Sequence, residues 1–146
     1  MKTYKGRFTP KNPKKYKGDP TNIIFRSGWE LRVMKWLDEK TDVVEWSSEE
    51  LSIAYKSPID NRAHRYFPDM LAKIRQPNGS IKTVLIEIKP EKQTKEPRKQ
   101  KKISQRYITE VTTWGVNKAK WEAARNFCAD RGWDFMILTE KDIFDE

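Results

Sequence analysis

Two acidic residues and a lysine stand on two apolar runs that are separated by turn formers. The runs, residues 65–74 and 81–89, are rich in β-branched, aromatic and aliphatic side chains, which favours a β-hairpin. The first run carries Asp69, and the second ends on Glu87 and Lys89. Carboxylates beside an amine can hold a divalent cation and act on a phosphate, so the hairpin is a candidate site for phosphate chemistry.

The connection between the runs decides whether these residues meet. Residues 76–80 read Gln-Pro-Asn-Gly-Ser. Proline and asparagine suit the centre of a type I turn, and Gly79 suits the left-handed position that closes a three-residue loop. With this loop, Asp69 stands directly opposite Glu87. A two-residue Asn-Gly turn would instead oppose Asp69 to Ile88 and place the carboxylates on opposite faces. The predicted site therefore depends on the longer loop.

Opposed carboxylates in a sheet repel each other, which costs up to about 1 kcal/mol on an exposed face. A divalent cation is the usual compensation, and Mg²⁺ prefers hard oxygen ligands such as carboxylates and phosphates. Asp69 and Glu87 are therefore the expected metal ligands, with the backbone carbonyl of Ile88 as a further oxygen and Mn²⁺ as a substitute ion. Lys89, on the same face as Glu87, could orient or deprotonate the attacking water, or neutralise charge on the phosphate.

These residues resemble a known signature. The segment 67–69, Phe-Pro-Asp, followed by the segment 87–89, Glu-Ile-Lys, is similar to the motif of PD-(D/E)XK nucleases, a Pro-Asp on one strand and an acid-x-Lys on the next. The resemblance implies metal-dependent hydrolysis of DNA by Asp69, Glu87 and Lys89. It also implies a mixed α/β fold like that of restriction endonucleases, in which flanking helices cover a central mixed sheet that carries the active-site hairpin.

A helix is predicted over residues 23–40, with Ser27 as its N-cap. Glu30 follows Ser27 by three residues and completes a capping box. On a helical wheel it lies beside Leu37 at the edge of the buried face, from where its carboxylate could reach the hairpin. In nucleases of the resembled superfamily an acid on the first helix often joins the metal site. Glu30 is therefore either a cap alone or a residue that binds or supports the metal.

The remaining elements predict an α/β order of helix, strands, hairpin, helices, strand and helix. Strands are expected over 43–46 and 51–55, helices over 103–111 and 116–131, then a strand over 133–138 and a short final helix. In the second of these helices Lys120 lies within the apolar arc, and its ammonium group is expected to extend to solvent rather than to act at the site, which stays the alternative. This order matches the core implied by the resemblance.

A length of 146 residues indicates one domain, residues 23–146, preceded by a basic extended arm over residues 1–22. The net charge of +9 favours a polyanionic partner, although a merely basic soluble protein would have the same composition. The single cysteine, Cys128, excludes an internal disulfide, and the single histidine, His64, excludes a multi-histidine metal centre. No apolar run is long enough for a membrane span, so we expect no membrane partner and an intracellular protein.

Two clusters of basic residues flank the predicted site. One enters the first strand, and the other follows Lys89 directly, where a DNA backbone leaving the site would pass. Both could equally be solvated surface that serves only solubility. The arm could likewise track phosphates, dock on a partner protein or be a solvated tail. The expected DNA-binding residues are Arg62, Arg65, Lys92, Lys95, Arg98, Lys99, Lys101 and Lys102.

A wider set of segments resembles the TnsA-type branch of these nucleases. The resemblance is carried by Ser-Gly-Trp-Glu at 27–30, the two hairpin segments, a late Lys-rich helix and Phe-Met-Ile-Leu-Thr-Glu at 135–140. TnsA-type enzymes commonly have glutamine where this chain has Glu87, so the acid here favours ordinary metal binding.

The length and the basic arm further resemble the head completion nucleases of T-even-like tailed phages. That resemblance implies processing of packaged double-stranded DNA during head completion and head-tail joining. It also implies head or neck proteins as partners, and a place in the host cytoplasm during assembly or in the virion. Two other classes stay open, a transposon or junction-type DNA endonuclease and a DNA-binding assembly protein without turnover. An RNA-binding surface is a further alternative.

Overall fold

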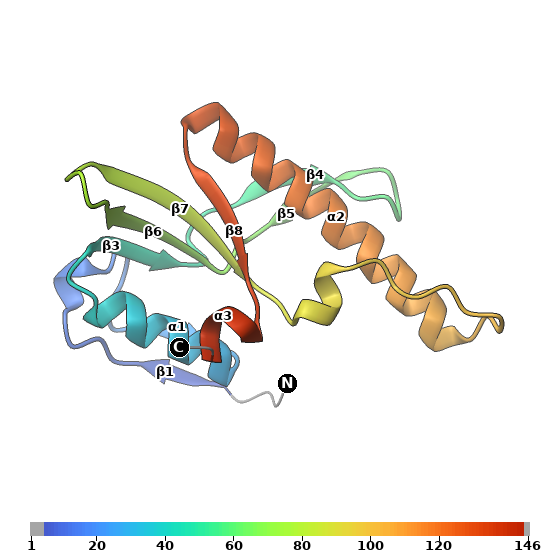
Figure 1. The fold of residues 1–146 in the computed structure, drawn as a ribbon, viewed down its shortest axis with the longest axis horizontal. Coiled ribbons are helices and arrows are strands. Elements are labelled where there is room, and N and C mark those ends of the chain that lie inside the picture. The colour runs from blue at the N-terminus through green and yellow to red at the C-terminus, as the bar shows by residue number, and fades with distance from the viewer. Residues whose placement is uncertain (1–4, 145–146) are drawn as a thin grey trace.

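A four-stranded mixed sheet forms the centre of the fold in the computed structural model, which describes residues 5–144. Its strands follow the order β3 (Val43–Ser48), β6 (Met70–Arg75), β7 (Ile81–Ile88) and β8 (Asp134–Leu138). The first three pair antiparallel, whereas β8 runs parallel to β7 (Figure 1). The end of β7 is buried on both faces, which explains its nearly continuous apolar sequence.

Helices cover both faces of this sheet (Figure 1). Helix α1 (Gly28–Glu39) packs in one core cluster with Ile86, and helix α2 (Gln105–Arg131) packs in a second cluster with Leu85. Because neighbouring side chains along a strand point to opposite faces, the two helices lie on opposite sides of β7. The short helix α3 (Glu140–Phe144) contacts α1. This arrangement confirms the predicted mixed α/β fold with a central mixed sheet.

The helix predicted over residues 23–40 begins later than expected. Ile23–Phe25 is strand β2, which pairs antiparallel with β1 (Gly6–Phe8). Ser27 is the N-cap as predicted, and its Oγ accepts a hydrogen bond from the Glu30 N–H at 3.2 Å. The β-branched run before Ser27 suits a strand wherever a partner strand is available. That partner comes from the arm, which the helix prediction did not take into account.

Residues 5–22 lie against the domain rather than extending away from it. Phe8 and Tyr16 are buried, with ring centroids 6.0 and 4.8 Å from that of the buried Trp46. The carboxylate of Asp38, on α1, is buried and accepts hydrogen bonds from two backbone N–H groups of this segment. The aromatic residues of the expected arm therefore belong to the hydrophobic core. Residues 1–4 of that arm lie outside the described residues.

The first strand of the predicted hairpin, residues 65–74, is broken in the structure. Its beginning belongs to β5 (Ala63–Tyr66), which pairs with β4 (Ile53–Lys56) in a separate two-stranded sheet. Strand β6 begins two residues after Pro68. Pro68 is fully buried, and because proline has no N–H it cannot continue a hydrogen-bonded ladder. The break separates the two sheets just before Asp69.

The helices predicted over residues 103–111 and 116–131 are one continuous helix, α2. The intervening Gly115 costs about 1 kcal/mol relative to alanine inside a helix, which packing along the rest of α2 outweighs. As predicted, α2 ends at Gly132, which takes a left-handed conformation with φ of 69°. Neither α2 nor any other helix within residues 5–144 is both long and apolar enough to cross a membrane.

Candidate active site

The turn of the hairpin has the predicted three-residue loop. The N–H of Gln76 donates to the carbonyl of Ser80 at 2.7 Å, and the N–H of Gly79 donates to the carbonyl of Gln76 at 2.8 Å. Gly79 has a φ of 88°, in the left-handed region that glycine adopts without strain. The alternative two-residue turn is therefore excluded.

This turn sets the pairing of β6 with β7. The last pair of the regular ladder is Met70 with Ile86, so the next residues in register are Asp69 and Glu87. The predicted opposition of the two carboxylates is therefore confirmed. Both side chains line one cavity together with Lys89, which lies two residues beyond Glu87 and so on the same face of the strand.

Pro68 affects the backbone of β7 at this point. Hydrogen-bonded and non-hydrogen-bonded pairs alternate along an antiparallel ladder. Because Gln76 and Ser80 form a hydrogen-bonded pair, Pro68 and Ile88 occupy positions of the same kind. Proline has no N–H, so Pro68 cannot donate to the Ile88 carbonyl. That carbonyl oxygen therefore lacks its ladder donor on the β6 side, which suits it to be a further ligand for a cation beside Asp69.

Each carboxylate is oriented by a donor from the protein. Oδ2 of Asp69 accepts a hydrogen bond from the Ile88 N–H at 2.7 Å. Oε2 of Glu87 accepts a longer one from Nε1 of Trp121, on α2, at 3.4 Å. Glu87 is only 5% exposed, so the strand and the helix together hold its carboxylate in a largely apolar setting.

The electrostatics of the pair favour a bound cation. Burial raises the pKa of Asp69 well above its ordinary value, and the charge of Glu87 raises it further. Within residues 5–144, no three His, Cys, Asp or Glu side chains are arranged to surround a metal ion. The donors at the pair itself are two carboxylates and one carbonyl, and the Glu30 carboxylate lines the same cavity. This all-oxygen set fits Mg²⁺, which retains several waters and takes further ligands from substrate phosphates.

The cavity around the pair has a volume of about 380 Å³ and collects residues from several elements. It contains all the expected metal and catalytic residues, and of the expected DNA-binding residues it contains Arg65. The lining residues are Ser27, Glu30, Arg65, Tyr66, Phe67, Asp69, Glu87, Ile88, Lys89 and Lys120.

Glu30 has both features that its position in the sequence suggested. Its N–H is capped by Ser27, and its side chain lines the cavity that contains Asp69 and Glu87. Burial raises the pKa of its carboxyl group, and the charge of nearby Glu49 adds to this effect. Helix capping alone therefore does not account for the position of the Glu30 side chain. Its part in metal binding stays a prediction.

Comparisons with known proteins agree with this geometry. Residues 40–140 match the family described as TnsA-like endonuclease N terminal. The chain is also 39% identical over 141 residues to the head completion nuclease of Enterobacteria phage T4, which covers 94% of this chain and 91% of that protein. The chain belongs to the TnsA-like endonuclease family. The resemblances to TnsA-type nucleases and to head completion nucleases, which were inferred from the sequence, are thereby confirmed.

The TnsA-like endonuclease site contains a cation that the sequence did not assign to it. Lys120 is half-buried and lines the cavity, so of the two expectations for it the structure favours a place at the site. Tyr66 lines it too, with a buried hydroxyl that has no hydrogen-bond partner among the described residues. Burial and the charge of Glu87 both raise the pKa of Tyr66. Only the position of Lys120 within an apolar arc hinted at this placement.

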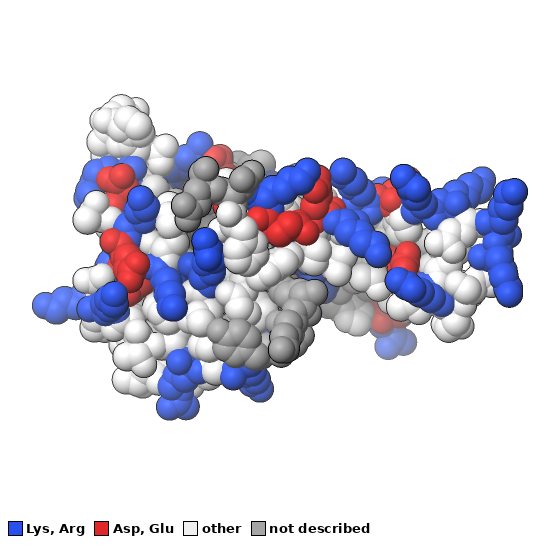
Figure 2. Space-filling model, turned by 60° about the horizontal axis from the view of Figure 1, so that its bottom comes forward, with Lys and Arg blue, Asp and Glu red and all other residues white. Residues whose placement is uncertain are grey.

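The basic segment of this endonuclease, residues 92–102, follows directly after the cavity residue Lys89. The backbone N–H of Glu91 donates to the Glu140 carboxylate at 2.7 Å, and the Glu91 carboxylate forms an ion pair with Lys141 at 2.9 Å. These two contacts attach the start of the segment to α3. Beyond this attachment, the segment and the start of α2 project from the sheet, and Lys and Arg side chains crowd this end of the molecule (Figures 1 and 2). The exposed members are Lys92, Lys95, Arg98, Lys99, Lys101 and Lys102; Arg62 is exposed as well.

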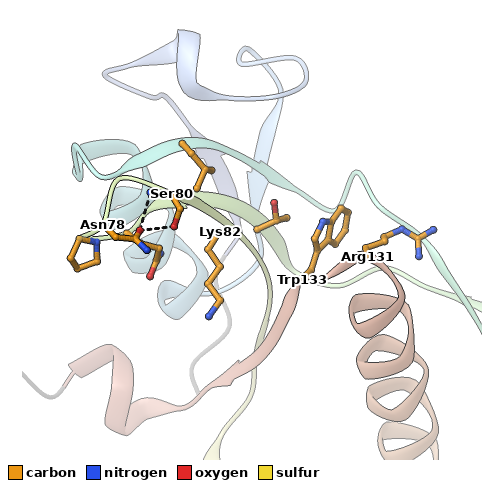
Figure 3. Close-up of a pocket in the computed structure, with 10 residues that line it drawn as sticks. Asn78, Ser80, Lys82, Arg131 and Trp133 are labelled. Atoms are coloured by element: carbon orange, nitrogen blue, oxygen red, sulfur yellow. Dashed lines mark hydrogen bonds between the residues drawn. The ribbon is translucent and has the colours of Figure 1, made fainter.

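A larger hollow of about 710 Å³ lies at the other end of the hairpin (Figure 3). Asn78, Ser80 and Lys82 line it on the hairpin side, and Arg131 and Trp133 line it where α2 leads into β8. Its lining has no carboxylate. The groups that suit phosphodiester hydrolysis therefore gather at the Asp69 end of the sheet.

Proposed function

We propose that this endonuclease hydrolyses phosphodiester bonds of double-stranded DNA in a reaction that depends on Mg²⁺. The observation that carries the proposal is the position of Asp69 directly opposite Glu87, with Lys89 on the same face of β7. Membership of the TnsA-like endonuclease family supports the reaction class.

The proposed roles in this reaction differ between the acidic residues and Lys89. Asp69 and Glu87, with the Ile88 carbonyl, would hold Mg²⁺ or Mn²⁺, and Glu30 is placed to support a ligand or join them. When bound, the ion supplies Lewis-acid stabilisation of the phosphate. Lys89 orients or deprotonates the attacking water, or offsets the charge that develops on the phosphate. No covalent intermediate is needed.

We infer the biological setting from the relative. The phage T4 protein is named a head completion nuclease, and it matches this chain over nearly its full length. The inferred role is the processing of packaged phage DNA while heads are completed and joined to tails, with head or neck proteins as partners. This activity would take place in the host cytoplasm during assembly, or in the virion.

The purified protein is expected to cut supercoiled and linear duplex DNA with Mg²⁺ or Mn²⁺, and to lose this activity in EDTA. Gel assays of both substrates measure it, and competition with duplex RNA tests for RNA as the preferred ligand. A protein that binds duplex DNA but never cuts it with either ion would be an assembly protein that retains the fold without turnover. Cutting only at transposon ends or branched junctions would favour the junction-type alternative.

A triple alanine variant of the basic segment is expected to bind duplex DNA more weakly without any change in the cleavage rate of bound DNA. The replaced residues are Lys99, Lys101 and Lys102. Each lost phosphate contact makes the slope of log affinity against log salt less negative by about 0.9. Fluorescence anisotropy over a salt series measures this slope.

The matched control for this triple variant removes the same charge from exposed lysines elsewhere, Lys35, Lys40 and Lys73. Equal slopes for the two triple variants would show that the segment contributes net charge but no specific path for DNA.

A further inference from the structure

Lys120 reaches the active-site cavity from α2, on the helix face that packs toward the small β4–β5 sheet. Its Nζ lies 5.8 Å from the ring centroid of Tyr55 and 5.6 Å from that of Tyr66. Tyr55 belongs to β4 and Tyr66 to β5, so two neighbouring strands provide the aromatic surface under this ammonium group. Such ring faces attract and orient a cation without neutralising its charge.

The ammonium group of Lys120 has no ion-pair partner within residues 5–144. Among the described residues, none of the ion pairs includes Lys120, although Glu30, Asp69 and Glu87 line the same cavity. A cation that is held on aromatic rings and not bonded to a carboxylate remains available for an anionic ligand. The anion that this cavity is suited to receive is a phosphodiester.

The next residue on α2 fixes where Lys120 lies relative to the acidic pair. Trp121 is 3% exposed and donates from Nε1 to Oε2 of Glu87 at 3.4 Å. The same turn of helix therefore both orients Glu87 and carries Lys120. The cavity thus has two lysines from different elements, Lys89 from the end of β7 and Lys120 from α2, beside exposed Arg65.

We propose that Lys120 is a second phosphate-binding residue of the active site, which contacts a phosphate oxygen of the DNA strand that enters the cavity. The proposal rests on the proposed nuclease function. Its role differs from that of Lys89, because Lys120 binds and positions the phosphate, whereas Lys89 acts on the water or on the charge that develops during the reaction.

The test compares Lys120→Met, which keeps the length of the side chain and removes its charge, with Lys120→Arg. Lys118→Met is the control on the same helix, because Lys118 lines a different hollow beside Trp114. Single-turnover cleavage with Mg²⁺ is expected to slow about 100-fold in Lys120→Met, to recover largely in Lys120→Arg, and to stay unchanged in Lys118→Met. Thermal melting of each variant checks that the fold is retained.

A second measurement does not require cleavage. Binding of a short duplex in EDTA over a salt series is expected to show a slope of log affinity against log salt that is less negative by about 0.9 in Lys120→Met than in wild type. If wild type does not cut DNA but this difference appears, the nuclease proposal fails and the phosphate contact stands. If wild type cuts DNA while Lys120→Met matches it in both rate and slope, the inference about Lys120 is overturned.

Discussion

Lys89→Ala is expected to reduce the rate of DNA cleavage by about 100- to 10,000-fold, which is the range for loss of a group that transfers a proton or stabilises the transition state. Duplex affinity should change little, because the exposed basic segment after Lys89 offers several other cations to the DNA. Lys89 is half-buried at the end of β7, and its backbone N–H donates to the Leu138 carbonyl at 3.0 Å. Its side chain can therefore be removed without breaking the sheet. Single-turnover cleavage of supercoiled DNA with Mg²⁺ measures the loss.

Lys82→Ala is the matched control for this variant. Lys82 lies on the same strand at the turn end of the hairpin (Figure 3). There it forms an ion pair with Asp134 on the surface. The control should cut DNA at the wild-type rate. If Lys89→Ala also cuts at the wild-type rate while folded, Lys89 has no part in the chemistry, and the proposed assignment of roles is wrong.

Trp46→Ala is expected to destabilise the protein by about 3–5 kcal/mol, because a large buried ring is lost and a cavity remains. Trp46 is 1% exposed and packs edge-on against Phe8 and Tyr16. Its carbonyl also accepts a hydrogen bond from the Lys17 N–H at 2.8 Å. The loss is a large part of the roughly 5–15 kcal/mol by which domains are stable. Urea unfolding followed by fluorescence measures it.

Trp36→Ala provides the comparison, because the Trp36 side chain is 47% exposed. Its expected cost is about 1 kcal/mol or less. The difference between the two variants tests whether the N-terminal segment packs on the domain in solution. Similar costs for both would mean that Phe8 and Tyr16 do not form a core with Trp46.

Local chemistry made part of the site predictable from the sequence. The Pro-Asn-Gly connection determines the loop, the loop determines the register, and the register places Asp69 opposite Glu87. The cap at Ser27 and the helix stop at Gly132 likewise follow from one or two residues. In each case the decisive hydrogen bonds join residues that are close in the chain, so their pattern appears in the order of residue types.

The limits of that prediction appear where distant segments compete for one partner. Ile23–Phe25 has an apolar pattern that suits either a helix or a strand, and it became a strand because β1 lies beside it. The run through Pro68 likewise looked continuous, but its two halves pair with different strands. A short apolar segment does not specify its neighbour, so its conformation depends on the packing that surrounds it.

The sequence by itself thus determined the hairpin, its register, the acidic pair and the family, while the tertiary structure decided what surrounds them. Only packing brought Lys120 and Tyr66 into the cavity and joined residues 5–22 to the core around Trp46. The physical reason is the range of the interactions. Turns and caps form between near neighbours, whereas the walls of a cavity come from helices and strands that meet only when the whole chain has folded.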